Sequence, residues 1–130
     1  MGFEQVFIYS DNSSIEVVDV LTGATLTSLK TSNPVGSNCL SLLASDYIVY
    51  AESDSAIVHF KPIKSSLNDR PVKVICPGKV SALATTSNGS FCIVGIGEKC
   101  YIWHVSITHS RVYGLNVSFS TFSVVQDSNR

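Results

Sequence analysis

Three histidines, His59, His104 and His109, are the residues of this chain best suited to acid–base chemistry. Such catalysis needs the imidazole beside a carboxylate or a nucleophile. His59 and His104 stand in β-type segments without such a companion, and no G-x-S-x-G sequence marks a serine as a nucleophile. We therefore interpret the histidines as ordinary strand residues, and we predict no catalytic residue and no enzymatic activity.

The cysteines do not have the spacing of a metal site. Zinc ligands occur in clusters such as C-x-x-C with a matching pair of histidines, and no such pattern occurs among Cys39, Cys76, Cys92 and Cys100. We predict that all four are reduced and that Cys39, Cys92 and Cys100 are small hydrophobic residues of the core. No metal ligand is predicted.

The sequence VGIGEK, which contains Gly95 and Gly97, is the nearest approach to a phosphate-binding loop. A phosphate loop needs a lysine at a fixed spacing and a helix that begins directly after it. Neither is present, so we interpret this segment as the end of a strand followed by a turn. No cofactor and no small-molecule substrate are predicted.

Composition places the chain among folded proteins, since 45% of its residues are hydrophobic and 15% are charged. The formal net charge of -1 provides no global basic field for nucleic acid, so we expect any association with RNA to be indirect. No run of apolar residues has the length of a membrane span, and the N-terminal residues lack the pattern of a signal peptide. We expect no membrane association.

Short β-type runs separated by turn residues fill the chain up to residue 106. Val, Ile, Phe, Tyr and Thr dominate the runs, and Gly, Pro, Asn and Ser stand between them, as strands and turns require. The predicted strands are Glu4–Tyr9, Ile15–Val20, Ala24–Leu29, Cys39–Leu43, Tyr47–Glu52, Ala56–Phe60, Val72–Cys76, Val80–Ala84, Phe91–Ile96 and Cys100–Val105. We predict that Thr31–Asn38 and Lys61–Arg70 are surface loops, the second of which carries three basic residues.

The runs repeat with a period typical of β-propeller blades. Aligning the last strand of each repeat makes Val18, Phe60 and Trp103 equivalent, at spacings of 42 and 43 residues. Asp19 and Trp103 each retain one half of the Trp-Asp dipeptide of WD repeats. We predict that Trp103 is a core residue rather than a binding hot spot. The turn glycines are predicted to be Gly23, Gly78, Gly89 and Gly97.

The segment ICPGKVSALATTSNGSFCIVGIGEKCYIWHVS resembles the early blades of the WD repeat-containing protein 18 family. The segments VVDVLTGATLTSL and LLASDYIVYAESDSAIVHF are similar in placement, and the resemblance extends over residues 4–106. It implies a non-enzymatic scaffold that binds other protein subunits of a pre-ribosomal, Rix-type complex. It also implies a role in pre-rRNA processing and large-subunit maturation in the nucleus or nucleolus, with a cytoplasmic location as the alternative for a truncated form.

The predicted fold class is all-β, with about two and a half blades of an incomplete, open propeller. The half blade covers residues 4–20, the two blades cover 24–61 and 72–105, and 107–130 is a divergent tail with one or two extra strands. We expect a truncated product that is marginally stable or self-associates. The alternatives are a WD-repeat module of another pathway, a non-functional truncated product, and a small β-sandwich enzyme or ligand-binding domain.

Overall fold

The computed structural model describes residues 6–43, 47–63, 71–109 and 113–125, with side chains for residues 8–43, 47–63 and 71–105. Eleven strands occur in this part of the chain, and it contains no helix that could span a membrane. The strands are β1 (Val6–Asp11), β2 (Ser14–Asp19), β3 (Thr25–Lys30), β4 (Val35–Leu43), β5 (Tyr47–Glu52), β6 (Ile57–Pro62), β7 (Val72–Ile75), β8 (Val80–Thr85), β9 (Phe91–Ile96), β10 (Lys99–His109) and β11 (Tyr113–Val125). The prediction of an all-β chain is confirmed.

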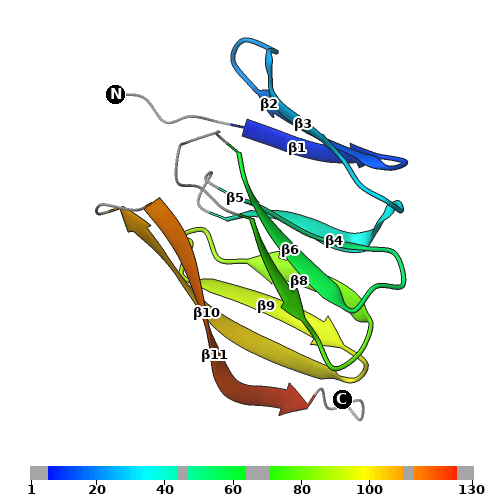
Figure 1. The fold of residues 1–130 in the computed structure, drawn as a ribbon, viewed down its shortest axis with the longest axis vertical. Helices are drawn as coiled ribbons and strands as arrows, with labels where there is room; N and C mark the ends of the chain where they lie inside the picture. The colour runs from blue at the N-terminus through cyan, green and yellow to red at the C-terminus, as the bar shows by residue number, and fades with distance from the viewer. Residues whose placement is uncertain (1–5, 44–46, 64–70, 110–112, 126–130) are drawn as a thin grey trace.

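The strands form three antiparallel sheets in sequence order. The first sheet has the order β1-β2-β3, the second β4-β5-β6-β7 and the third β8-β9-β10-β11. Figure 1 shows the sheets following one another from the blue N-terminal sheet at the top to the yellow-to-red C-terminal sheet at the bottom. Strands β4 and β8, which begin the second and third sheets, lie beside each other.

The sheets are offset by one strand from the repeats that we predicted at residues 24–61 and 72–105. Strand β3 belongs to the first sheet, where Ile15 pairs with Leu29, and β7 belongs to the second sheet, where Phe60 pairs with Val72. Each predicted repeat therefore begins with the last strand of one sheet and continues with the first three strands of the next. In the tail, β11 pairs along β10 from Lys99 to His109.

Turn residues end the strands where the sequence predicted. Asn12 and Asp54 adopt positive φ angles of 53° and 61° in the turns after β1 and β5, and Asn and Asp tolerate this region better than most residues do. One difference is that β4 begins at Val35, inside the segment predicted as a loop. Its pairing with β5 is interrupted between Val35 and Leu40, where Asn38 has a φ of 61°. The bulge hides the start of this strand from a simple alternation pattern.

Two hydrophobic cores lie on the two sides of the second sheet. The larger core lies between the second and third sheets and includes Tyr47, Val49, Phe60, Val94 and Trp103. The smaller core joins the second sheet to the first through Ile15, Val17, Ile48, Tyr50 and Ile63. Five consecutive residues of β5, Tyr47–Ala51, are buried because both faces of this strand are covered.

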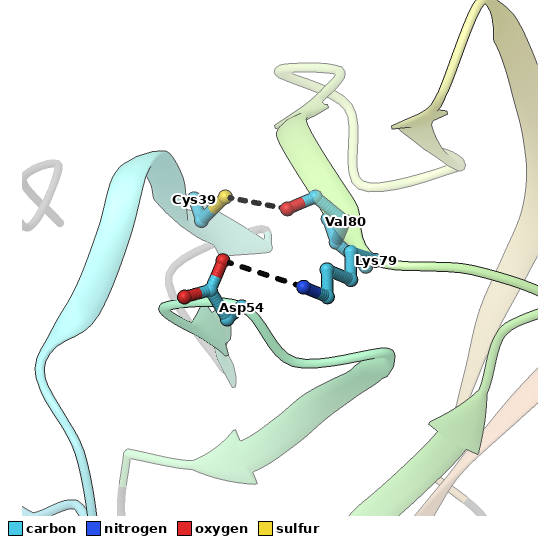
Figure 2. Close-up of polar contacts among 4 residues, drawn as sticks. All are labelled: Cys39, Asp54, Lys79 and Val80. Carbon is cyan, nitrogen blue, oxygen red and sulfur yellow. Dashed lines mark hydrogen bonds and ion pairs between the residues drawn. The ribbon is translucent and has the colours of Figure 1, made fainter.

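Polar contacts connect the second sheet to the third beside the larger core. The Cys39 thiol donates to the carbonyl of Val80 at 3.8 Å, and the Lys79 ammonium lies 3.9 Å from the carboxylate of Asp54 (Figure 2). Since Lys79 and Asp54 are largely exposed, their ion pair contributes little to stability. Ser41 and Thr85 add a hydroxyl–hydroxyl hydrogen bond of 2.7 Å between β4 and β8.

Candidate functional site

His59 of β6 is half-buried and lies on the same side of the second sheet as Tyr50, with which it pairs. Its imidazole stacks on the ring of Tyr50, with centroids 4.6 Å apart and planes 12° from parallel. Burial lowers the pKa of His59 and raises the pKa of Tyr50 to about 12, in each case because the charged form loses water. Nδ1 of His59 has no hydrogen-bond partner among the described atoms. This arrangement favours a neutral ring that fills space between strands.

His104 of β10 is exposed, and its imidazole meets the ring of Phe91 edge-on, with centroids 5.3 Å apart and planes at 68°. His109 is the last residue of β10, and its side chain lies outside the described side chains. His59 and His104 lie in different sheets, so the structure does not bring these two histidines together.

The cysteines are free thiols, and three of them are buried. Burial raises the pKa values of Cys39 and Cys76, and it raises that of Cys92 to about 12, with a further contribution from the neighbouring Cys76. A thiol held protonated in this way is a poor nucleophile and a poor metal ligand. Among the described residues no group of three or more His, Cys, Asp or Glu side chains has the arrangement of a metal site.

The sequence repeat made Phe60 of the second sheet equivalent to Trp103 of the third, at a spacing of 43 residues. In the structure the two side chains point in opposite directions, toward each other. Both are buried in the larger core, and their rings contact each other across the second and third sheets with centroids 6.4 Å apart. Phe60 therefore faces forward, toward the third sheet, while Trp103 faces back toward the second. Because side chains alternate along a strand, a shift of one residue exchanges the two faces. By side-chain direction Phe60 corresponds to Val17 and Ile102, at spacings of 43 and 42 residues.

Val18 and Asp19 are the last two residues of β2. Val18 is half-buried and alternates with Val17, which is buried against the second sheet. The Asp19 carboxylate accepts hydrogen bonds from the backbone N–H of Leu21 at 2.8 Å and of Thr22 at 3.3 Å. Asp19 thus shapes the turn into β3, which is a structural role.

Three of the four predicted turn glycines have positive φ angles. The angles are 76° at Gly23, 74° at Gly89 and 63° at Gly97, a region that other L residues rarely adopt. At Gly78 the restriction is one of space, since an added Cβ would lie 3.0 Å from Cγ2 of Ile96. In the basic loop that we predicted at Lys61–Arg70, Lys61 belongs to β6, whereas residues 64–70 lie outside the described residues.

The third sheet presents an apolar surface on the side that faces away from the second sheet. We call this surface the forward face of the third sheet; its described side chains include Ala84, Phe91, Ile93, Cys100, Ile102 and His104. Phe91 is 37% exposed and Ile93 is 36% exposed. Ile93 pairs with Ala84 on one side and with Ile102 on the other, which makes a continuous apolar row. The described side chains of this row, Ala84, Ile93 and Ile102, are all aliphatic.

Sequence reasoning missed this surface because the run FCIVGI is apolar at successive positions, as in a strand that is covered on both sides. One signal that could have found it is the comparison with YIVYAE of β5. Tyr47 and Val49 of that strand lie on the side of the second sheet that faces the third sheet and is covered by it. Phe91 and Ile93 lie on the corresponding side of the third sheet, where both are partly exposed.

Comparison with known sequences confirms the resemblance read from the residues. A 90-residue segment is 30% identical to WD repeat-containing protein 18 of Danio rerio and covers 69% of this chain and 20% of that relative. A 93-residue segment is 29% identical to the protein of the same name from Rattus norvegicus and covers 72% of this chain and 21% of that relative. The chain thus spans about a fifth of the length of these relatives. No protein-family model matches it.

Solved structures with the same arrangement of sheets identify the fold. A chain in the crystal structure of the mitotic checkpoint complex superposes with a TM-score of 0.59 at 18% identity, over 76% of this chain and 30% of its own length. Hsv2 of Kluyvelomyces marxianus superposes with a TM-score of 0.60 at 15% identity, over 94% of this chain and 38% of its own. The sheets are therefore blades of a WD-type β-propeller, as predicted.

The same architecture also occurs in an enzyme. Dihydro-heme d1 dehydrogenase NirN superposes with a TM-score of 0.54 at 12% identity, over 76% of this chain and 22% of its own. The fold alone does not decide between a scaffold and an enzyme, so the function has to be argued from the side chains.

Proposed function

We propose that this chain is a non-enzymatic protein-interaction scaffold that acts with protein subunits of a pre-ribosomal complex. The observation that carries the proposal is its similarity to WD repeat-containing protein 18 over 90 or more residues of aligned sequence. The side chains support the scaffold role, since His59 is half-buried and its pKa is lowered, Cys92 is held as a protonated thiol and the described residues contain no cluster of metal ligands. By this proposal the chain contributes to pre-rRNA processing and large-subunit maturation in the nucleus.

Sedimentation of the tagged chain in a nuclear extract tests this role. We expect the chain to travel with particles that contain precursors of the large-subunit rRNA. We also expect it to stay bound to protein subunits after ribonuclease treatment, because its net charge of -1 favours protein contacts over direct RNA contacts. The matched controls are Phe60→Asp, which places a carboxylate in the larger core, and Leu26→Asp, which changes a residue that is 43% exposed.

Association that persists in Leu26→Asp and disappears in Phe60→Asp would support a role that depends on the folded blades. If the folded wild-type chain sediments entirely apart from the precursor particles, the proposed pathway is wrong. An interaction module of another pathway would then be the better reading of the same fold.

A further inference from the structure

The turn between β8 and β9 contains the one Asn-Gly pair of the sequence, Asn88-Gly89. An asparagine followed by glycine can modify itself in water, because glycine has no side chain to hinder attack by its backbone nitrogen on the asparagine carboxamide. Asn88 is exposed to the solvent that this reaction consumes. The proposed scaffold role does not involve this pair.

The reaction is a deamidation, and it proceeds through a cyclic imide. The backbone nitrogen of Gly89 loses its proton to a solvent base and attacks Cγ of Asn88, so that a bond between Gly89 N and Cγ forms and the bond between Cγ and Nδ2 breaks. The amide nitrogen takes up a proton and leaves as ammonia, and a succinimide remains. Water then opens this ring at either of its carbonyl carbons, which gives aspartate or isoaspartate at position 88.

In the folded chain the attacking nitrogen is not free. The N–H of Gly89 donates to the carbonyl of Thr86 at 3.0 Å, and Gly89 is buried. The φ angle of 74° at Gly89 belongs to a tight hairpin turn. Because a base has to remove the Gly89 proton before the attack, a hydrogen bond that holds this proton inside the turn slows the first step.

The carboxamide of Asn88 is also held in place. Its Oδ1 accepts hydrogen bonds from the Thr86 hydroxyl at 2.7 Å and from the N–H of Ser90 at 3.0 Å. These donors polarise the amide, but they also fix its rotation, whereas ring formation requires Cγ to turn toward the nitrogen of Gly89. The Thr86 hydroxyl in turn accepts from the N–H of Phe91 at 3.1 Å, at the start of β9. Both reacting groups are therefore bound to Thr86.

We propose that Asn88 is a deamidation site that the turn at Thr86–Ser90 protects, so that the modification occurs when this turn opens locally. The two products differ in their effect on the fold. Aspartate keeps the length of the backbone, and its carboxylate can accept the same two hydrogen bonds. Isoaspartate adds a methylene group to the backbone, which displaces Gly89 from Thr86 and disturbs the register of β8 and β9. Formation of isoaspartate thus makes a transient opening of the turn permanent.

Incubation of the full chain at mildly alkaline pH, followed by peptide mass spectrometry, tests the proposal. The measured quantity is the rate at which Asn88 gains the mass of an amide-to-acid conversion, and an isoaspartyl-specific methyltransferase measures the isoaspartate fraction. We expect Asn88 of the folded wild type to react at least about tenfold more slowly than Asn88 of a peptide with residues 83–94, because only the locally open fraction of the folded chain reacts. The full chain unfolded in urea should react as the peptide does.

Substitution of Thr86 tests whether its hydrogen bonds provide the protection. Thr86→Val removes the hydroxyl that binds the Asn88 carboxamide and keeps the shape of the side chain, so the rate should rise toward that of the peptide. Thr86→Ser is the matched control, because it keeps the hydroxyl and should leave the rate close to that of the wild type. Hydrogen exchange of the Gly89 amide in the wild type needs no substitution, and we expect at least about tenfold protection there.

Equal deamidation rates in the folded wild type and the peptide would overturn the proposal, because the turn would then give no protection. An Asn88 that stays unmodified in the peptide and in urea would also overturn it, since the site would not be reactive. If Thr86→Val is folded by circular dichroism and reacts as slowly as the wild type, the hydrogen bonds of Thr86 are not the cause. These outcomes do not bear on the proposed scaffold role, which this inference does not require.

Discussion

A mutant cycle between Phe60 and Trp103 tests how the second and third blades are held together. Both side chains are buried, and their rings contact each other at 6.4 Å between centroids, with planes at 40°. An aromatic pair of this kind stabilises a fold by ~0.5–1.5 kcal/mol beyond the area that it buries. Truncation of Phe60 to alanine would cost ~3–5 kcal/mol, a large part of the ~5–15 kcal/mol that holds a typical domain.

Leucine is therefore the better replacement, since it keeps most of the buried volume and leaves a folded protein to measure. We expect the free energies of unfolding of the wild type, Phe60→Leu, Trp103→Leu and the double variant to give a coupling energy of ~0.5–1.5 kcal/mol. Urea unfolding followed by far-ultraviolet circular dichroism suits all four proteins. Fluorescence does not, because Trp103 is the one tryptophan of the sequence.

The control cycle pairs Phe60→Leu with Phe91→Leu. Phe91 lies on the forward face of the third blade, away from Phe60, so these two changes should add within ~0.3–0.5 kcal/mol. Additivity in the Phe60–Trp103 cycle as well would refute the reasoning. The two rings would then not meet, and the opposite directions that we assign to them would be wrong.

Two further changes probe the half-buried His59 and the turn at Gly97. Burial holds the pKa of His59 below its ordinary value of 6.5, so the unfolded chain binds more protons than the folded chain in this range. The free energy of unfolding should have its full value above pH 6.5 and decrease as the pH falls from 6.5 toward the pKa of His59 in the folded chain. His59→Phe keeps an aromatic ring stacked on Tyr50 and should reduce this decrease. Urea titrations at a series of pH values measure it. Gly97→Ala should lower the free energy of unfolding by ~1–2 kcal/mol, because alanine is strained at the φ of 63° that Gly97 adopts. A steric clash does not contribute, since no atom lies within 4 Å of the added Cβ. Thermal melts of Gly97→Ala and Gly97→Asn check this, and equal stability of the alanine variant and the wild type would contradict it.

The positions of most strands could be predicted from local sequence alone. The predicted strands Tyr47–Glu52 and Phe91–Ile96 coincide with β5 and β9, because β-branched and aromatic residues fill these runs and turn residues bound them. The start of β4 at Val35 could not be predicted, since a bulge interrupts its pattern. The grouping of strands into sheets could not be predicted from the repeat period, because the period is the same whichever strand is taken as the first of a repeat.

Side-chain direction was the harder part of the candidate site. Matching Phe60 with Trp103 by their aromatic character places them on the same face, whereas the structure has them facing each other from neighbouring blades. Successive side chains of a strand point to opposite faces of the sheet, so an alignment error of one residue assigns each side chain to the wrong face. The composition of the strand does not reveal such an error. The partly exposed apolar surface around Ile93 was missed for the same reason, because a strand that is apolar at successive positions does not indicate which of its two faces is covered.

Because separate cores lie on the two sides of the second blade, the stability of each blade depends mainly on its packing against the adjacent blade. The first and third blades each bury their apolar side chains against the second, through Ile15 and Val17 on one side and Val94 and Trp103 on the other. Arrays of this kind behave as nearly one-dimensional chains, in which a local change is felt mainly by the adjoining repeat. A substitution in the first blade weakens one junction, whereas a substitution in β5 weakens two at once. Tolerance of sequence change should therefore be lowest in the middle of the array and increase toward its first blade.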